Sequence, residues 1–551
     1  MSTSQLWPVA SAEEMRALDR FTIEEIGCPG DVLMESAGRA VAERVLAKCH
    51  AAKRPSTRVI VVCGAGNNGG DGFVVARHLH QAGIDVVAVL LSAVDDLSED
   101  AARNYHRIAK LKVATTEELD VIADGTIVVD AMFGTGLSRD IDGAAAKAVI
   151  EVNRAGANGA HVIAVDLPSG LCADTGQVLG CAVRANETVA IGLPKTGLCL
   201  EPGREHAGVI SIARIGIVDE TPDTKPKGFV WTREGAAAAL PARPASGHKG
   251  TFGHVLLVAG ARGKTGAAHL AAMGATRAGA GLVTVACPAG VSEILEIKTT
   301  EAMTVAVADT EDNSFASGSI SQLLALANER DVVAVGPGVG LHDETINLTH
   351  ELARRVEKPL VIDADGLNAF SSDAGEASIL KARAHPTVLT PHPGEAARLL
   401  GTATHAINRD RVGAARSLAR TTGSVVILKG AGTVIAAPEG YYAINPTGGP
   451  ALAAGGSGDV LTGLVAAFIA QGLNVFNASV LGAWLHGAAG DVASQRRGTS
   501  GLLASEIADE VPGICADLRR QFDPSDIGAD SEMEARRDER GLSFLRPFPG
   551  A

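Results

Sequence analysis

Short apolar runs rich in β-branched residues alternate with longer stretches of helical spacing along most of the chain. Most runs are followed directly by Gly, Pro or Asp, and then by a helical pattern. This alternation is typical of parallel sheets whose strands are joined by crossover helices. The runs form two series: Val59–Cys63, Val86–Leu91, Thr126–Asp130 and His161–Asp166 in the first half, and His254–Val258, Leu282–Ala286, Val332–Val335, Leu360–Asp363, Thr387–Thr390 and Val425–Leu428 in the second.

Because a segment without apolar runs separates the two series, we predict two α/β domains, followed by a tail. A polar, proline-bearing segment between them, Thr221–Gly228, is typical of a linker. We therefore expect one domain over residues 1–225 and a second over residues 230–520. Residues 521–551 are charged and lack periodicity, which predicts a disordered tail.

Composition narrows the class of protein. Hydrophobic residues make up 46% and charged residues 20% of the 551 residues, as in globular proteins. The net charge of −14 argues against a nucleic-acid partner, because Lys and Arg bind phosphate backbones. An anionic cofactor must then be held by backbone N–H groups and helix N-termini. The eight cysteines are not spaced as in zinc-binding motifs. No segment approaches a length of about 20 apolar residues, which a membrane-spanning helix needs. We expect a cytoplasmic homo-oligomer that binds small molecules and no membrane.

A glycine-rich sequence, Gly64–Gly72, follows the first strand of the first half. Its glycines satisfy the GxGxxG pattern between a strand and a helix, which alone would favour a Rossmann dehydrogenase. The same loop carries Asn67, Asn68 and Asp71. A carboxylate there would repel a pyrophosphate, whereas two amides and a carboxylate suit a cation or a polar ring. A turn with only structural meaning is the alternative.

Two further strands of the first half end in aspartates. Asp130 begins the sequence DAMFGTGLSRD, and Asp166 begins DLPSG, which contains Ser169. Because the carboxyl ends of parallel strands share one edge of a sheet, we expect these residues to meet the glycine-rich loop in one crevice. Asn68, Asp130 and Ser169 could then supply hard oxygen ligands to a cation. Asp166 could instead only cap the helix that follows.

The motifs GAGNNGGDG, DAMFGTGL and VDLPSG, with the segment that starts at Met15, together resemble the NAD(P)H-hydrate epimerase family over about residues 11–220. The resemblance implies a Rossmann-like three-layer domain and a potassium ion held by Asn68, Asp130 and Ser169. The reaction inverts C6 of the hydrated nicotinamide ring, and Asp166 is our candidate for the catalytic carboxylate that moves a proton on the C6 hydroxyl. The implied substrate-binding residues are Asn67, Asn68, Gly69, Gly70, Asp71, Gly134, Thr135, Gly136, Leu137, Ser138, Arg139, Asp140 and Asp166.

The most informative motif of the second half is a glycine-rich loop before an apolar helix. The loop Gly455–Gly458 precedes VLTGLVAAFIA, so its N–H groups predict an anion hole at a helix N-terminus. Asp459 at the helix start is placed to take a proton from a hydroxyl that attacks a terminal phosphate. Such a helix start also occurs without function, but the nearby motifs Lys429–Thr433 and His392–Glu395 weaken that alternative.

These motifs together resemble the ADP-dependent NAD(P)H-hydrate dehydratase family, of ribokinase-like three-layer α/β fold, over about residues 235–515. Related small-molecule kinases have an Asn-x-x-Glu motif near magnesium, and this chain has His392 in place of the asparagine. The resemblance implies ADP with Mg²⁺. The implied nucleotide-binding residues are Lys429, Gly430, Ala431, Gly432, Thr433 and Gly458, and the implied contacts to the hydrated cofactor are Ala267, Gly338, His392 and the catalytic Asp459.

Leaving-group chemistry links the two halves. Hydroxide leaves poorly, whereas a phosphate ester leaves well. Phosphorylation of the C6 hydroxyl by ADP, followed by elimination driven by the ring nitrogen, would restore NADH or NADPH and release AMP and phosphate. The dehydratase would take the S hydrate, and the epimerase would supply it from the R hydrate. Two alternatives remain open: a vitamin-type kinase fused to a dinucleotide-binding regulatory domain, and a protein-interaction module in the first half, which also resembles proteins named for apolipoprotein binding.

Overall fold

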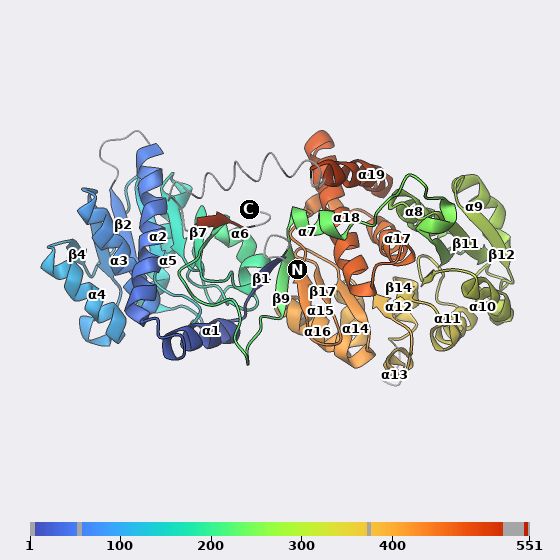
Figure 1. The fold of residues 1–551 in the computed structure, drawn as a ribbon, viewed down its shortest axis with the longest axis horizontal. Coiled ribbons are helices and arrows are strands. Elements are labelled where there is room, and N and C mark those ends of the chain that lie inside the picture. The colour runs from blue at the N-terminus through green and yellow to red at the C-terminus, as the bar shows by residue number, and fades with distance from the viewer. Residues whose placement is uncertain (1–5, 52–57, 372–375, 522–544, 549–551) are drawn as a thin grey trace. The chain divides into compact units, whose positions relative to one another are not determined.

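The structure is a computed structural model that describes residues 6–51, 58–371, 376–521 and 545–548. The chain divides into two compact units (Figure 1). The N-terminal unit comprises residues 8–228 and 529–551, and the C-terminal unit comprises residues 1–7 and 229–528. The boundary lies at the end of the linker segment Thr221–Gly228. Each unit is built on its own largely parallel sheet, so the predicted α/β class is confirmed.

The sheet of the N-terminal unit has the strand order β19-β8-β7-β6-β5-β2-β3-β4. Neighbouring strands are parallel except for β19, which is antiparallel to β8. From β2 the chain proceeds to β3 on one side and later returns to β5 on the other, so the order reverses between β2 and β5. Such a reversal opens a crevice at the carboxyl ends of the strands. The strands are β2 (Val59–Cys63), β3 (Val86–Leu90), β4 (Ala114–Thr116), β5 (Ile127–Ala131), β6 (His161–Val165), β7 (Glu187–Ile191), β8 (Val209–Ala213) and β19 (Leu545–Pro547).

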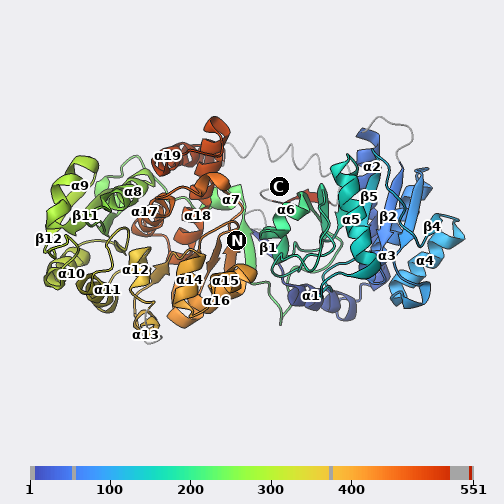
Figure 2. The ribbon, with the colours of Figure 1, turned by 180° about the vertical axis from the view of Figure 1, so that it is seen from behind.

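Helices cover both faces of this sheet (Figures 1 and 2). The helices α2 (Gly30–Ala51), α3 (Asn67–Gln81) and α4 (Glu99–Lys110) share one core with Val61, and α5 (Gly143–Ala157) shares another with Val62. Successive residues of a strand point to opposite faces, which explains why neighbours in one apolar run belong to different cores. The continuous apolar runs of the sequence therefore reflect burial on both faces.

The sheet of the C-terminal unit has the order β1-β9-β18-β17-β16-β15-β14-β13-β10-β11-β12. The strands from β12 to β16 are parallel, and β17 and β18 continue the sheet as antiparallel strands. Here the order reverses between β10 and β13. The strands are β1 (Leu6–Val9), β9 (Gly228–Trp231), β10 (His254–Val258), β11 (Leu282–Pro288), β12 (Met303–Val307), β13 (Val332–Val335), β14 (Leu360–Ile362), β15 (Thr387–Leu389), β16 (Val425–Leu428), β17 (Val434–Ala436) and β18 (Tyr442–Ile444).

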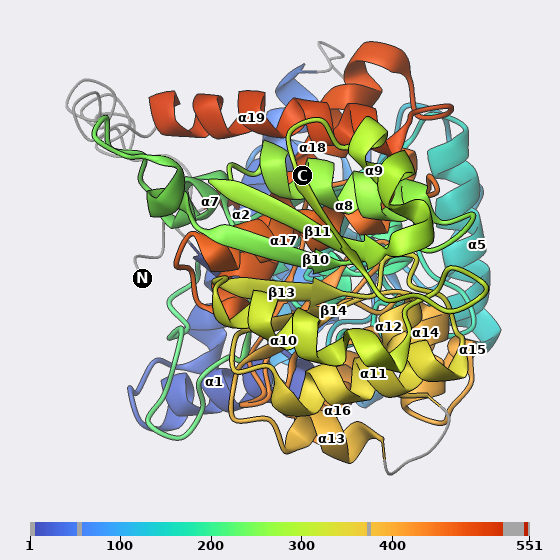
Figure 3. The same cartoon turned by 90° about the vertical axis from the view of Figure 1, so that its right-hand side faces the viewer.

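Figure 3 shows α8 (Thr265–Arg277), α17 (Ser457–Ala470), α18 (Val475–Arg497) and α19 (Ala504–Gln521) on one face of this sheet, and α10 (Ile320–Asn328) and α11 (Asp343–Arg355) on the other. α8 and α17 approach closely. A Cβ atom on Gly274 would lie 2.3 Å from the Val460 carbonyl oxygen, and one on Gly463 would lie 2.1 Å from the Ala271 carbonyl oxygen. Close helix packing therefore accounts for the run of small residues in this part of the sequence.

Every strand predicted from the two series of apolar runs is present, within two residues of the predicted bounds. Other strands, such as β7 and β8, were not predicted. Most of the tail predicted as disordered lies outside the described residues. For Leu545–Pro547 the prediction is wrong, because these residues form β19 and pair with β8. Among the described helices, none is both long enough and apolar enough to cross a membrane.

Candidate active sites

The loop between β2 and α3 lies against the loop that follows β5. A Cβ atom on Gly64 would lie 1.9 Å from the Met132 carbonyl oxygen, and one on Gly69 would lie 1.9 Å from the Gly64 carbonyl oxygen. Close backbone approach therefore requires glycine at both positions. α3 begins at Asn67, so Asn67 and Asn68 belong to its first turn rather than to an extended loop. Two of the strand ends that the sequence places at one crevice thus meet.

The carboxylate at the end of β5 is bound by a serine from the loop after β6. The Ser169 hydroxyl donates to Oδ1 of Asp130 over 2.6 Å, and the Ser169 backbone N–H donates to Oδ2 over 2.8 Å. Both residues are fully buried. Burial raises the pKa of Asp130 to about 6, although the hydrogen bonds from Ser169 act in the opposite direction. Two of the three predicted cation ligands are therefore in direct contact.

The third predicted ligand, Asn68, faces the loop after β5. A Cβ atom on Gly134 would lie 3.5 Å from Asn68 Oδ1. The Nδ2 atom of Asn68 is buried and has no hydrogen-bond partner in the described part of the chain. Buried amides are normally hydrogen-bonded, so this orphaned atom indicates a place where a ligand is bound. The other residues expected to line the substrate, 135–140, form a half-buried to exposed stretch that continues from Gly134.

Asp166 is held by a lysine that the sequence analysis did not single out. Lys195 Nζ donates to Oδ1 of Asp166 and, over 2.7 Å, to the Ile191 carbonyl oxygen. The Ile191 backbone N–H donates to the same Oδ1 over 3.0 Å. Lys195 is 1% exposed. The backbone of Asp166 has φ of +69°, which is uncommon for a residue other than glycine and is maintained here by these contacts.

Asp71 lies on α3 and belongs to the same electrostatic cluster. Burial raises the pKa of Asp71 well above its ordinary value, the charge of Asp166 raises it further, and Lys195 lowers it. Asp71 and Asp166 are therefore two nearby carboxyl groups of which one has a strong preference for the neutral form. Such a difference is characteristic of acid–base sites.

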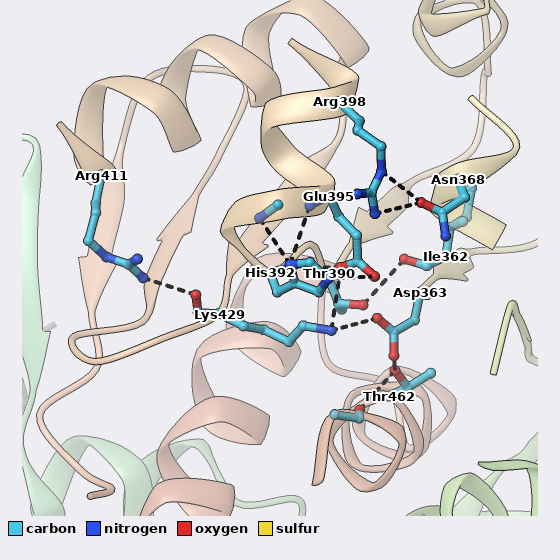
Figure 4. A network of polar contacts seen from close by, with 12 residues as sticks. Ile362, Asp363, Asn368, Thr390, His392, Glu395, Arg398, Arg411, Lys429 and Thr462 are labelled. Atoms are coloured by element: carbon cyan, nitrogen blue, oxygen red, sulfur yellow. Dashed lines mark hydrogen bonds and ion pairs between the residues drawn. The ribbon is translucent and has the colours of Figure 1, made fainter. Parts of the chain in front are cut away.

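In the C-terminal unit, Asp363 is the centre of a buried polar network (Figure 4). Lys429 Nζ donates to its Oδ1 over 2.8 Å, and the Thr462 hydroxyl on α17 donates to its Oδ2 over 2.7 Å. Burial alone would raise the pKa of Asp363, but the Lys429 cation lowers it below the ordinary value. Burial alone would lower the pKa of Lys429, but Asp363 and Glu395 raise it. Both partners are therefore charged at neutral pH.

The predicted anion hole and the candidate base lie beside this ion pair. α17 begins at Ser457, directly after Gly456, whose φ of +90° favours glycine. Burial raises the pKa of Asp459, in the first turn, to about 7, and the charge of Asp363 contributes in the same direction. A Cβ atom on Gly458 would lie 3.3 Å from Lys429 Nζ. Gly458 and Lys429, both predicted to bind nucleotide, are thus neighbours.

His392 has a structural role in addition to the predicted contact with substrate. It is the N-cap residue of α14 (Pro393–Leu399), and its Nδ1 accepts the backbone N–H groups of Gly394 over 3.0 Å and Glu395 over 3.3 Å. Glu395 accepts the His392 backbone N–H over 2.7 Å. Nδ1 is therefore occupied, and Nε2, 3.5 Å from Glu395 Oε1, is left for other contacts. Burial lowers the pKa of His392, so the ring is neutral at pH 7.

The predicted nucleotide loop, Lys429–Thr433, joins β16 to β17. The buried Arg411 donates from Nη2 to the carbonyl oxygens of Leu428 over 3.0 Å and Lys429 over 3.1 Å (Figure 4). These bonds anchor the backbone at the start of the loop. The Lys429 side chain is directed to Asp363, so a nucleotide would meet this lysine within an existing ion pair.

Ala267 and Gly338, two predicted contacts of the hydrated cofactor, lie together. Gly338 has φ of +65°, and a Cβ atom there would lie 3.2 Å from the Ala267 Cβ and 2.7 Å from the Lys264 carbonyl oxygen. Lys264 Nζ is 2.8 Å from Oδ2 of Asp365, which also accepts the Gly340 N–H over 3.0 Å. The loop after β13 and the start of α8 therefore form one wall of the site.

Sequence reasoning missed several residues of these networks. Asp363 carried a usable signal, because it ends an apolar run in the same way as Asp130 and Asp166. Lys195 and Thr462 had no recognisable sequence signal, because each is distant in sequence from the carboxylate that it contacts.

Comparisons with known proteins agree with this division of the chain. The family described as YjeF-related protein N-terminus matches residues 30–197, and the family described as NAD(P)H-hydrate dehydratase matches residues 255–513. The chain is 43% identical over 525 residues to the bifunctional NAD(P)H-hydrate repair enzyme Nnr of Moorella thermoacetica, covering 94% of this chain and 98% of that protein. The Thermofilum pendens enzyme of the same name is 40% identical, covering 94% and 97%.

The chain belongs to the bifunctional NAD(P)H-hydrate repair enzymes. The predicted order, an epimerase half followed by a dehydratase half, is confirmed by these relatives and by the two matched families. Neither the vitamin-type kinase nor the interaction module is supported as a description of the whole chain. Among solved structures, the ADP/ATP-dependent NAD(P)H-hydrate dehydratase of Bacillus subtilis, co-crystallized with ATP/Mg²⁺, is 30% identical and covers 52% of this chain and 98% of its own, with a TM-score of 0.45.

Proposed function

We propose that the C-terminal unit dehydrates the S hydrate of NADH or NADPH by transferring a phosphoryl group from ADP to its C6 hydroxyl. The observation that carries this proposal is the position of Asp459 in the first turn of α17, beside the charged pair of Lys429 and Asp363. With a pKa of about 7, Asp459 can accept the hydroxyl proton at neutral pH. The N–H groups at the start of α17 would stabilise the phosphate oxygens.

The phosphate ester at C6 then departs, because the ring nitrogen forms a double bond to C6 as the C6–O bond breaks. Loss of a proton from C5 restores the reduced nicotinamide, and AMP and phosphate are released. The backbone of Lys429–Thr433 would hold the adenine nucleotide, and His392, Gly338 and Ala267 would contact the hydrated ring.

Magnesium would enter this site with the nucleotide and neutralise charge on its phosphates. Glu395 is the residue that would hold it, since it is buried and retains the carboxylate of the kinase motif. Burial raises the pKa of Glu395, which Lys429 at 3.9 Å only partly offsets. A buried carboxylate fits a divalent cation that binds one or two carboxylates and substrate phosphates.

We further propose that the N-terminal unit interconverts the R and S hydrates, with Asp166 moving the proton on the C6 hydroxyl. The NNGGD segment and the stretch 134–140 would line the substrate. Potassium would be held by Asn68, Asp130 and Ser169. The buried Asp130 carboxylate, the Ser169 hydroxyl and Oδ1 of Asn68 are hard oxygen ligands that suit a monovalent cation, whereas the orphaned Asn68 Nδ2 is a hydrogen-bond donor and takes no part in binding the cation. Within the described ranges, no group of three or more His, Cys, Asp or Glu is arranged as a metal site, and this site combines carboxylate, amide and hydroxyl oxygens instead.

The experiment that tests both proposals follows a mixture of hydrated NADH epimers at the reduced-nicotinamide absorbance band. With ADP and Mg²⁺ we expect the whole mixture to be converted to NADH. Without ADP we expect no conversion, and with ATP in place of ADP we expect a slower conversion. If the conversion stopped once the S hydrate was consumed, the epimerase assignment would be contradicted. Formation of a stable phosphorylated product would contradict the dehydratase assignment.

The potassium site is tested with Asp130→Ala. We expect slower epimer exchange and loss of its response to K⁺, with ADP-dependent dehydration unchanged. Because the pKa of Asp130 is about 6 without a cation, K⁺ binding should strengthen as the pH rises through that value. If exchange in the wild type is indifferent to K⁺ and the variant behaves identically, the cation assignment is wrong.

A further inference from the structure

One buried lysine faces three carboxyl groups in the N-terminal unit. Lys195 contacts Asp166 directly, and its charge also acts on Asp71 of α3 and on Asp19 of α1 (Ala12–Glu24). Burial raises the pKa of Asp19, and Asp100 on α4 raises it further, whereas Lys195 lowers it. These are the charged and titratable groups that act on this cluster from the elements packed around it.

The backbone on both sides of Lys195 is fixed. The Ala10 N–H donates to the Pro194 carbonyl oxygen over 3.0 Å, and the Thr196 N–H donates to the Ala10 carbonyl oxygen over 3.0 Å. Nζ is then held between the Ile191 carbonyl oxygen and Oδ1 of Asp166. A 1% exposed lysine with this many restraints has little freedom to turn elsewhere.

The hydrogen bonds to Asp166 are unevenly divided between its two oxygens. Oδ1 accepts from both Lys195 Nζ and the Ile191 N–H, whereas in the described part of the chain Oδ2 accepts from neither. The carboxylate is therefore oriented by one oxygen and leaves the other for substrate. Asp166 directly follows β6, at the carboxyl ends of the strands, where the proposed substrate crevice lies.

We propose that Lys195 is a positioning residue of the epimerase: it holds Oδ1 of Asp166, so that Oδ2 of Asp166 is turned to the substrate and accepts a proton while Asp71 donates one. This inference rests on the proposed role of Asp166. In the reaction, the C6 hydroxyl takes the proton of the Asp71 carboxyl and leaves as water, as the ring nitrogen forms a double bond to C6. Water then adds to the opposite face, gives its proton to Oδ2 of Asp166, and the two carboxyl groups exchange the proton through solvent.

Asp71 has the environment that a proton donor to the C6 hydroxyl needs. Its burial and the neighbouring charge of Asp166 both favour the neutral carboxyl, which is the form that donates. Lys195 Nζ is hydrogen-bonded to Asp166, and no hydrogen bond joins it to Asp71 in the described part of the chain. The lysine therefore orients the carboxyl group that accepts the proton and not the one that donates it.

The test measures R-to-S exchange by chromatography at several hydrate concentrations in the intact chain. Lys195→Met should slow exchange about 100-fold at neutral pH, within the range for general acid–base catalysis. The loss should appear in kcat and not in the Michaelis constant for the hydrate, because Asp166 is misoriented while the residues that line the substrate are unchanged. Lys195→Arg, which keeps a donor to Asp166, should restore part of kcat. Dehydration of pure S hydrate in the other unit should not change.

Lys48→Met is the matched control. Lys48 also pairs with a buried carboxylate, Glu187, over 2.7 Å, but at the opposite end of β7 from Ile191. Lys48→Met should leave both kcat and the Michaelis constant for exchange unchanged. In an Asp166→Asn background, Lys195→Met should have no additional effect, because Lys195 acts through Asp166.

The outcomes separate the inference from the function on which it rests. If the wild-type protein does not exchange the epimers, the proposed epimerase function itself is contradicted. If the wild type is active and Lys195→Met keeps its kcat, or if Lys48→Met loses as much kcat as Lys195→Met, the role of Lys195 alone is overturned. If Lys195→Met does not fold, Lys195→Gln gives the same comparison without a charge.

Discussion

At the residue scale, each unit contains carboxyl groups of similar chemistry in opposite electrostatic environments. Asp363 accepts hydrogen bonds from a lysine and a threonine and remains charged, whereas Asp459 has its pKa raised to about 7. In the N-terminal unit, Asp166 has a lysine partner and Asp71 is driven towards the neutral form. Neighbouring groups, rather than residue type, therefore assign the role of each carboxyl group.

The first prediction concerns Asp459. Asp459→Asn should lower ADP-dependent recovery of NADH by about 10²–10⁴-fold, the usual contribution of a positioned base, and should leave epimer exchange unchanged. Because the raised pKa lies at about 7, the carboxylate form increases as the pH rises through that value. The wild-type rate at limiting hydrate should therefore rise between about pH 6 and about pH 8.

The matched control is the pH profile of Asp459→Asn, which should lack this rise. If a folded variant loses both activities, the two sites are not independent. If it keeps the rise in rate, a different group titrates.

The second prediction concerns His392, which has both a capping role and a proposed substrate contact. His392→Ala should raise the Michaelis constant for the hydrate about 5- to 150-fold, from a lost hydrogen bond of about 1–3 kcal/mol, with little change for ADP. It should also lower stability by about 1 kcal/mol, because the N-cap of α14 is lost.

His392→Asn separates these two effects. Asparagine is a good N-cap residue, so this variant should recover stability while the Michaelis constant for the hydrate stays high. Saturation curves and thermal unfolding of both variants give the measurements. Impaired ADP binding with normal hydrate binding would favour the arrangement found in small-molecule kinases.

At the scale of elements, the site of the C-terminal unit depends on how closely two helices pack. α17 carries Asp459 and Thr462 into the polar network, and its position is set by backbone contact with α8 at Gly274 and Gly463. α8 in turn carries Ala267 to Gly338. The glycines between these helices therefore act on the active site through geometry.

The third prediction tests this contact with Gly463→Ala. The added Cβ would lie 2.1 Å from the Ala271 carbonyl oxygen and 2.6 Å from the Ala275 nitrogen, so the helices must separate. We expect a loss of about 1–3 kcal/mol in unfolding free energy and slower dehydration. Gly513→Ala on α19 is the control, since its Cβ would meet no atom within 4 Å and should stabilise the helix by up to about 1 kcal/mol. Equal effects of both variants on chemical denaturation would contradict the packing argument.

At the scale of the whole molecule, the two activities belong to two separate cores. The N-terminal unit buries its apolar residues on both faces of its eight-stranded sheet, and the C-terminal unit has its own core beneath α8 and α17. Each sheet has its own reversal of strand order, and the residues of each proposed site follow the carboxyl ends of strands near it. The first strand of the chain, β1, belongs to the sheet of the C-terminal unit, and β19, near its end, belongs to that of the N-terminal unit.

The fourth prediction follows from this separation. ADP with Mg²⁺ should stabilise the C-terminal unit alone, by about 2.7 kcal/mol at a ligand concentration 100 times the dissociation constant. Calorimetry should then show one transition that moves upward while the other stays in place. The control is Asp459→Asn, which removes the base but keeps the loop Lys429–Thr433, and should show the same shift. Movement of both transitions together would mean that the units unfold as one.

The sequence by itself determined the strands of the two apolar series and the two-part organisation, and it singled out strand-end residues that the fold brings together. Apolar periodicity, glycine-rich loops and strand-end aspartates are local patterns, and the topology of parallel sheets gathers their ends on one edge. Asp130 and Ser169 could therefore be expected near one another before the fold was seen, whereas Gly338 and Ala267 were implied only by the family resemblance.

Tertiary structure alone decided which groups pair. Lys195 with Asp166, Thr462 with Asp363, and the antiparallel strand β19 each join segments that lack a shared local pattern. It also directed the Lys429 side chain to Asp363 and made His392 a helix cap. The ionisation of a carboxyl group depends on burial and on charges within a few ångströms, and those distances exist only once the chain has folded.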